Sequence, residues 1–194
     1  MSDRSMVAEV EARLAERLGP EAFKHSVAVA RTAERLAEEY GVDPEQAYLA
    51  GLLHDWAREM SGTELVASAR EYGFEVSDVD GAVPYLLHAR VGARQVVEAF
   101  PGIDGEVVSA VSAHTFGDDE MSDLTRIVYI ADMIEPGRDF EGVARLREAV
   151  GAVDLDELFA SAYTETLLHL VRSRRHIHPQ TVAVWNAIVE RGDS

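Results

Sequence analysis

The sequence has no cysteine, which excludes disulfide bonds and thiolate metal sites. Any metal ion must therefore be held by histidine and carboxylate side chains. The chain also has no apolar run of 18 residues, and its first segment, MSDRSMVAEVEARLAERLG, lacks the apolar centre of a signal peptide. We therefore expect no membrane-spanning helix and a cytoplasmic location.

Basic residues are scarce in this chain. Eighteen Lys and Arg stand against 35 Asp and Glu, which gives a formal net charge of −17. A nucleic-acid backbone or an anionic membrane surface would repel a protein of this charge. We therefore expect neither a nucleic-acid polymer nor a membrane among its partners. A small phosphate ligand stays compatible, because a metal ion and a few arginines can neutralise it locally.

The composition that is present is typical of one globular domain. Hydrophobic residues make up 47% of the 194 residues, and a chain of this length buries roughly 70% of its unfolded surface. Apolar residues recur with helical spacing nearly throughout, and strand alternation is absent. The sequence therefore predicts an all-α fold. The expected helices cover about 5–18, 21–40, 44–60, 62–73, 84–100, 104–115, 121–134, 140–150, 154–175 and 179–191.

Several boundaries carry start or stop residues. Gly41 is an expected helix stop, and Asp43 with Pro44 supplies an N-cap followed by proline at the first helical position. Ser61 and Glu64 form the pattern of a capping box. Residues from about 73 to 83 are predicted to form a loop. No repeat or linker interrupts the pattern, so we expect a single domain over the whole chain.

Three apolar runs contain polar residues that a buried helix does not normally hold. They are 49–57, with His54 and Asp55; 127–134, with Asp132; and 83–88, which ends at His88. A helix that is apolar on every side is buried, and a buried aspartate is costly unless it is paired, hydrogen-bonded or bound to a metal. One divalent cation shared by Asp55 and Asp132 is the simplest common partner.

Helix geometry allows His25 to join this set. Two antiparallel helices joined near residue 42 would bring His25 and His54 to heights that differ by about 7 Å. Each residue also has a purely structural interpretation: a histidine on an apolar face is often only buried, and Asp55 can pair with Arg58. Together the polar residues favour one metal site over several separate explanations. The set is His25, His54, Asp55, His88, His114 and Asp132.

The pattern His25…His54-Asp55…Asp132 resembles the HD-domain superfamily of metal-dependent phosphohydrolases, and more closely its YqeK family. The resemblance extends over about residues 22–186, and the segments ADMIEPGRDF and IHPQT are its most specific parts. It implies a single HD-domain-like helical bundle over residues 1–194. In that bundle a metal-binding core covers about 21–135, and C-terminal helices over about 140–191 complete a nucleotide site.

The resemblance also implies a reaction. The YqeK family resembles hydrolases that split diadenosine tetraphosphate (Ap4A) symmetrically into two ADP with iron or another transition metal. His25, His54, Asp55 and Asp132 match the family's metal ligands. His88 and His114 match positions near the metal or the phosphates and can complete a second metal site. We therefore expect one or two ions of iron, or of manganese, cobalt or zinc. The implied catalytic residues are Asp55, His88 and His114.

The substrate contacts implied by the resemblance are more widely spread. They are Lys24, Arg58, His88, His114, Thr115, Arg138, Arg175, Ile177 and His178. Three residues depart from the family pattern: Arg90 replaces a proline, Phe116 a small polar residue, and Ala22 a basic residue. These departures concern substrate preference and leave the metal ligands untouched.

Other functions stay open at this level. The same site would suit a nucleotidase or phosphodiesterase that acts on mononucleotides. A non-catalytic module that binds ADP-like ligands is a second alternative, supported only by the three departures. A purely structural helical protein would leave Asp55 and Asp132 unexplained. An acidic helical surface can still hide an apolar dimer patch, so a homodimer is compatible with the sequence.

Overall fold

The computed structural model describes residues 3–192. Within that range the chain forms eleven α-helices, one short 3-10 helix and no strand, which confirms the all-α prediction. No helix in that range is long and apolar enough to cross a membrane. The elements are α1 (Asp3–Arg17), α2 (Pro20–Tyr40), α3 (Pro44–Leu53), α4 (Gly62–Glu71), α5 (Asp78–Ala82), η1 (Pro84–Leu87), α6 (His88–Ala99), α7 (Gly105–Ala113), α8 (Asp123–Ile134), α9 (Val143–Ala149), α10 (Leu155–Arg172) and α11 (Pro179–Gly192).

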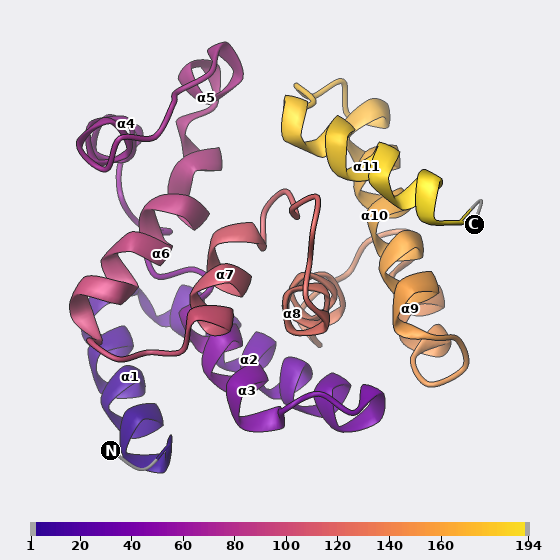
Figure 1. The fold of residues 1–194 in the computed structure, drawn as a ribbon, viewed down its shortest axis with the longest axis horizontal. Coiled ribbons are helices and arrows are strands. Elements are labelled where there is room, and N and C mark those ends of the chain that lie inside the picture. The colour runs from indigo at the N-terminus through magenta and orange to yellow at the C-terminus, as the bar shows by residue number, and fades with distance from the viewer. Residues whose placement is uncertain (1–2, 193–194) are drawn as a thin grey trace.

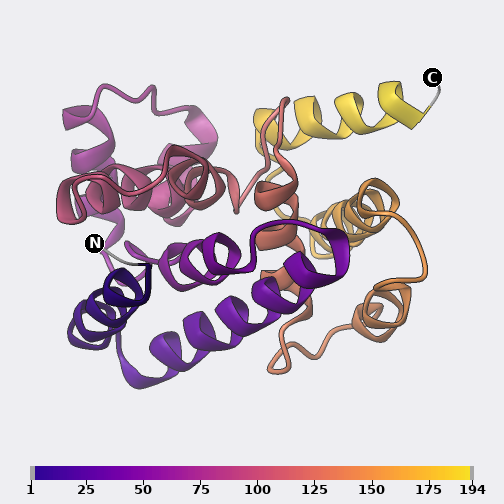
Figure 2. The same ribbon diagram turned by 60° about the horizontal axis from the view of Figure 1, so that its bottom comes forward.

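Helix α8 lies between the two ends of the chain (Figure 1). It packs against α2, α3 and α7, which precede it, and against α9 and α10, which follow it. Figure 2 shows α2 and α3 side by side as an antiparallel hairpin. Helix α8 therefore contacts helices from both halves of the chain. Residues from both halves can meet at its C-terminal end.

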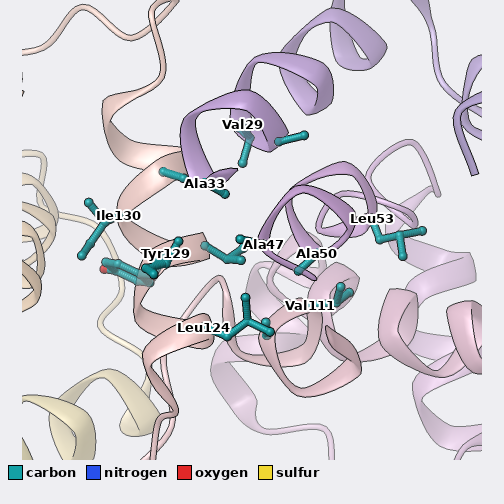
Figure 3. Packing of buried hydrophobic residues seen from close by; sticks show 14 of the residues in the cluster. Val29, Ala33, Ala47, Ala50, Leu53, Val111, Leu124, Tyr129 and Ile130 are labelled. Atoms are coloured by element: carbon teal, nitrogen blue, oxygen red, sulfur yellow. The ribbon is translucent and has the colours of Figure 1, made fainter. Parts of the chain in front are cut away.

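The hydrophobic core fills the space between α2, α3, α7 and α8 (Figure 3). Small side chains are buried where α2 and α3 pack together, among them Ala33 of α2 and Ala47 and Ala50 of α3. Larger side chains such as Leu124 and Ile130 line α8. Because small residues let backbones approach closely, the α2–α3 hairpin is tight, and the residues it carries are held at short range.

The predicted start and stop residues occupy the expected positions. Gly41 ends α2 in the left-handed region, with a φ of 73°. The Asp43 carboxylate accepts a hydrogen bond from the Glu45 amide at 2.9 Å and so caps α3. Ser61 and Glu64 form the reciprocal capping box of α4. These local signals therefore determine how the chain enters α3 and α4.

The helix predicted over residues 44–60 was too long. Helix α3 ends at Leu53, and residues 54–59 form successive turns. Hydrogen bonds run from the Trp56 amide to the Leu53 carbonyl and from the Arg58 amide to the Asp55 carbonyl, over three residues instead of four. The helix therefore stops immediately before the two most polar residues of the run, His54 and Asp55.

Two further boundaries differ from the prediction. The predicted loop over 73–83 contains the short helix α5, which begins with a capping box between Ser77 and Asp80. The helix predicted over 84–100 is divided into η1 and α6, and the division falls between Leu87 and His88. The 3-10 geometry of η1 turns the chain so that His88 opens a new helix.

Candidate metal centre and active site

Six polar side chains from five separate segments meet beside the C-terminal end of α8. The residues are His25 of α2, His54 and Asp55 directly after α3, His88 at the start of α6, His114 directly after α7 and Asp132 in the last turn of α8. The rings of His25 and His54 lie 5.3 Å apart, so the α2–α3 hairpin does bring these two residues together.

Each of the four imidazoles places its Nδ1 atom against an oxygen acceptor. Three of them place Nδ1 within 2.7–2.8 Å of the backbone carbonyl three residues earlier. These pairs are His54 with Gly51, His88 with Tyr85, and His114 with Val111. His25 places Nδ1 3.2 Å from the Glu135 carboxylate. Because a carbonyl or carboxylate oxygen accepts, Nδ1 is the donor in each of these contacts, and Nε2 is the ring atom that faces the cluster.

The Nε2 atoms face one another and the two aspartates at short distances. His88 Nε2 lies 3.0 Å from His114 Nε2. His54 Nε2 is buried without a hydrogen-bond partner, although it lies 3.2 Å from Asp55 Oδ2. Lone pairs at such distances repel unless a cation or proton lies between them. Imidazole Nε2 and carboxylate oxygen are donors that suit a transition metal, so the residues present fit such an ion.

Asp55 stands between two pairs of imidazoles. Its Oδ2 lies 3.2 Å from His54 Nε2 and 3.7 Å from His25 Nε2. Its Oδ1 lies 3.2 Å from His88 Nε2 and 3.8 Å from His114 Nε2. Two groups of potential ligands therefore share this one carboxylate, each with ligand atoms within 4.8 Å of one another. An arrangement of this kind can hold one ion or two.

Asp132 extends the first of these groups. Its Oδ1 lies 3.0 Å from His25 Nε2 and 3.9 Å from His54 Nε2. Burial by itself would raise the pKa of Asp132, but the hydrogen bond with His25 and the charges of His54 and Arg138 lower it. The same balance, with His54 contributing most, holds the pKa of Asp55 well below its usual range. Both carboxylates are therefore ionised at neutral pH, as metal binding requires.

The histidines differ in their protonation. Burial and the neighbouring His88 and His54 lower the pKa of His114 to about 3, so this ring is neutral. Burial would lower the pKa of His54 as well, but the Asp55 carboxylate raises it above the usual value. His114 therefore presents a free lone pair at neutral pH, whereas a divalent cation at His54 would compete with a proton.

Two arginines bind the aspartates from the cavity side. Arg58 donates to Asp55 Oδ2, and Arg138 donates to Asp132 Oδ1 and, at 2.7 Å, to the Asp132 carbonyl. Both line a cavity of about 290 Å³ that opens onto the cluster, and Thr115 lines it as well. Because each guanidinium is only partly buried, it can also face an anion inside the cavity.

Two residues of this site were missed by the sequence analysis. Glu135 is buried and holds Nδ1 of His25. Tyr85 lines the cavity, is 43% exposed, and stacks on His88 with the ring centroids 4.4 Å apart. Glu135 follows an apolar helix directly, and this buried acid could have been treated like Asp132. Nothing in the sequence distinguishes Tyr85 from an ordinary apolar residue of its run.

Other predicted substrate contacts do not belong to this cavity. Lys24, Arg175 and Ile177 are exposed and do not line it. His178 belongs to a separate cluster, in which its ring stacks on Phe116 at 4.2 Å and its Nε2 lies 3.5 Å from Asp80 Oδ1. The structure thus divides the predicted substrate residues into an inner group and an outer group.

Two of the three departures from the family pattern lie together. Arg90 and Phe116 line a second cavity, of about 260 Å³, beside His178. The guanidinium of Arg90 lies over the Phe74 ring, 4.6 Å from its centroid. Ala22 lies in the first turn of α2 and packs against the core. None of the three contacts the aspartates of the cluster.

Comparison with known proteins agrees with the geometry. Residues 22–137 match the HD domain family. The chain is 34% identical over 167 residues to the "Bis(5'-nucleosyl)-tetraphosphatase, symmetrical" of Halalkalibacterium halodurans, which covers 86% of this chain and 88% of that protein. The protein of the same description from Bacillus subtilis is 30% identical, with 86% and 89% covered.

A solved structure has the same fold. The crystal structure of an HD superfamily hydrolase from Clostridium acetobutylicum, described as involved in NAD metabolism, superposes with a TM-score of 0.89. It is 34% identical, and the match covers 95% of this chain and 97% of that one. Residues 22–137, which match the HD domain family, contain every residue of the metal-ligand pattern. The chain therefore belongs to the HD domain family.

Proposed function

We propose that this chain is a metal-dependent hydrolase that cleaves dinucleoside tetraphosphates symmetrically, with Ap4A giving two ADP. The observation that carries the proposal is the convergence of four imidazole Nε2 atoms on Asp55, beside a cavity that holds Arg58 and Arg138. The relatives described as symmetrical tetraphosphatases supply the substrate. Bacterial relatives in which a similar region accompanies a nucleotide adenylyltransferase are described as Ap4A hydrolases too.

The donor set favours a divalent transition metal. Iron is our first proposal, with manganese, cobalt or zinc as alternatives, because imidazole and carboxylate suit all four. His25, His54, Asp55 and Asp132 would hold one ion, and Asp55, His88 and His114 a second. When bound, such an ion lowers the pKa of water and polarises a phosphoryl oxygen.

The protein's own residues supply charge and position. Arg58 and Arg138, which lie beside the two aspartates, would neutralise the charge of a bound phosphate. This matters because phosphoryl transfer depends mainly on positioning and charge stabilisation. Thr115 lines the same cavity and offers a hydroxyl to a phosphate oxygen. His88 and His114 are proposed as catalytic with Asp55, because their Nε2 atoms and its carboxylate can hold a cation beside the phosphates.

The nucleoside parts of the substrate would extend beyond this cavity. We propose that Lys24, Arg175, Ile177 and His178 contact them, and that residues from about 140 to 191 complete the site built by residues 21–135. One contact supports a role of the C-terminal helices in the site: Thr166 of α10 lines the inner cavity, and its hydroxyl lies 2.8 Å from the Tyr129 hydroxyl. We also propose a cytoplasmic location and a homodimer for this protein.

The test combines metal content with product analysis. Protein purified without chelator is analysed for bound metals and then incubated with Ap4A, and the products are separated by chromatography. We expect one or two transition-metal ions per chain and ADP as the only product. ATP with AMP would contradict symmetrical cleavage. Absence of both metal and turnover, also after iron, manganese or cobalt is added, would favour the binding module.

Alanine variants test the residue assignment. Asp55→Ala and Asp132→Ala should lose metal and reduce turnover at least 100-fold, because each removes a carboxylate ligand. Asp123→Ala is the matched control, since Asp123 lies on the same helix as Asp132 and its side chain is 58% exposed. Circular dichroism verifies the fold of each variant. Full activity in either site variant would refute the assignment.

A mononucleotide phosphohydrolase is the second candidate. The inner cavity, at about 290 Å³, lies at the small end of the range for ligand sites and would hold the phosphates of one nucleotide. Assays with AMP, ADP and dNMP substrates under the same metal conditions separate the two functions. Turnover of mononucleotides without cleavage of Ap4A would favour this candidate.

A further inference from the structure

Arg147 of α9 binds the end of α8 from outside the site. Its Nε donates to the Ile134 carbonyl at 2.9 Å, and its Nη2 donates to the carbonyls of Glu135 at 2.7 Å and Arg138 at 3.0 Å. The last carbonyls of a helix have no partner within it, and the fork of Arg147 binds the end of α8 together with the turn that follows it. Arg147 thereby fixes the path of residues 134–138.

This same turn carries two contacts to the proposed metal centre. The Glu135 carboxylate lies 3.2 Å from Nδ1 of His25 and also accepts the Gly137 amide. The Arg138 guanidinium donates to Asp132 Oδ1. A carboxylate on the outer nitrogen of a ligating histidine sets the direction of the ring and the basicity of its inner nitrogen. Movement of the turn would therefore be transmitted to two of the proposed ligands.

We propose that Arg147 is a positioning residue of the metal centre, acting through the backbone of residues 134–138 on His25 and Asp132. This inference rests on the proposed metal site but not on the identity of the substrate. Arg147 touches no ligand itself. Its role is to hold Glu135 and Arg138 in the directions that the centre needs.

A lysine variant distinguishes the forked geometry of Arg147 from its positive charge alone. A cation at a helix C-terminus is stabilising whatever its shape, so Arg147→Lys would behave like the wild type if charge alone mattered. A single ammonium cannot reproduce the planar fork that reaches three carbonyls. If the planar guanidinium is required, Arg147→Lys should lose most of the Mn²⁺ affinity that Arg147→Ala loses. The residue is exposed beside a cavity of about 540 Å³, so neither variant leaves a void in the core.

The direct measurement is calorimetric titration of the metal-free protein with Mn²⁺. Arg147→Ala should raise the Mn²⁺ dissociation constant about 10-fold, as is usual when a partner of a ligand is removed, and Arg147→Lys at least 3-fold. Arg145→Ala is the matched control on the same helix, because Arg145 pairs with Glu165 at 2.8 Å and does not contact the turn. That variant should stay within about 2-fold of the wild type.

A double-mutant cycle tests the route through Glu135. Glu135→Gln alone should weaken Mn²⁺ binding, because an amide no longer fixes the His25 ring in the same way. Arg147→Ala added to Glu135→Gln should then cost less than it does in the wild type, since the two changes share a route. An equal loss in both backgrounds would overturn this route.

Hydrogen exchange supplies a readout that needs no metal. In the metal-free protein, Arg147→Ala should speed amide exchange in peptides covering residues 133–139, and Arg145→Ala should not. Unchanged exchange there, or Mn²⁺ affinity equal to that of Arg145→Ala, overturns the inference while the proposed function stands. A wild type that binds Mn²⁺ but does not cleave Ap4A contradicts the proposed substrate only. A wild type that binds no divalent cation contradicts both proposals.

Discussion

Gly51 shows how one residue can control the distance between two ligand-bearing helices. A Cβ atom built on Gly51 would lie 2.6 Å from the Cα and 2.9 Å from the backbone nitrogen of Ala30. No rotamer change relieves such a contact, because the atoms it meets are backbone. The Gly51 carbonyl also accepts the hydrogen bond from His54 Nδ1 at 2.8 Å. The residue thus sets both the approach of α2 to α3 and the direction of one ring.

We expect Gly51→Ala to destabilise the protein by about 1–3 kcal/mol or more, because α3 must move away from α2. Urea unfolding followed by circular dichroism measures this. Gly105→Ala is the control: Gly105 begins α7, nothing lies within 4 Å of its added Cβ, and the change should be neutral or stabilising by up to about 1 kcal/mol. Equal stability of the two variants would contradict the backbone contact as the cause.

Some residues and contacts of the site could be predicted from the sequence, and others could not. The aspartates of two apolar runs could be singled out, because a charge in an apolar helix has few explanations. The pairing of His25 with Glu135 could not be predicted, since 110 residues separate the two and only the folded chain brings them together. The suggested pairing of Asp55 with Arg58 does form, but within the site instead of on a solvated helix face.

At the scale of elements, α8 and α10 are joined through buried tyrosines. The rings of Tyr129 and Tyr163 stack with centroids 5.4 Å apart. The Tyr163 hydroxyl donates to the carbonyl of Phe116, two residues after His114, at 2.6 Å. Burial raises the pKa of both phenols above the usual value. The pair therefore connects the C-terminal helices to the segment that carries a proposed ligand.

These raised pKa values predict sensitivity to alkali. Above pH 10 the tyrosines of the unfolded chain ionise while Tyr129 and Tyr163 stay protonated in the folded chain. The unfolded state then binds fewer protons, so the free energy of unfolding falls as pH rises, by about 1.4 kcal/mol per pH unit for each tyrosine. Below pH 10 this contribution to stability is fully present.

Tyr163→Phe should remove one of these two contributions. We expect the variant to be less stable at pH 8 by about 1–2 kcal/mol, because the Phe116 carbonyl loses its donor. Between pH 10 and 11 its stability should fall less steeply than that of the wild type. Urea unfolding at several pH values measures both effects. Parallel pH profiles would show that Tyr163 ionises equally in both states.

Element boundaries were predictable where the signal is local. Caps at Asp43 and Ser61 were recognised from side chains that bond the next turn. The same logic applied to Ser77 and Asp80 would have found α5. The end of α3 at Leu53 was missed because the apolar run continues to Ala57, and periodicity alone does not reveal that the hydrogen bonding changes from four residues to three.

At the scale of the whole molecule, a chain of net charge −17 gathers ionised carboxylates and imidazoles in its interior. Asp55, His54, His88 and His114 are all buried. Grouping them costs desolvation that Arg58 and Arg138 offset only in part, because each binds an aspartate and leaves the Nε2 atoms facing one another. A bound cation should therefore stabilise the entire fold.

The expected size of this effect follows from linkage. A ligand at 100 times its dissociation constant stabilises the folded state by about 2.7 kcal/mol, which raises Tm by roughly 5–10 °C for a protein of this size. We expect this shift when MnCl₂ is added to chelator-treated protein in a thermal unfolding scan. CaCl₂ should have little effect, since calcium prefers oxygen ligands. Asp55→Ala should abolish the response to manganese, and its persistence in that variant would contradict Asp55 as the shared ligand.

The wide spacing of the cluster along the chain has a consequence for biosynthesis. His25 leaves the ribosome before Glu135, which holds its ring and follows 110 residues later. At ordinary rates of synthesis this interval lasts roughly 5–20 s. During that time the first histidine and the His54-Asp55 pair are outside the ribosome without their later partners. The proposed metal centre can therefore be complete only after α8, which carries Asp132, has been synthesised.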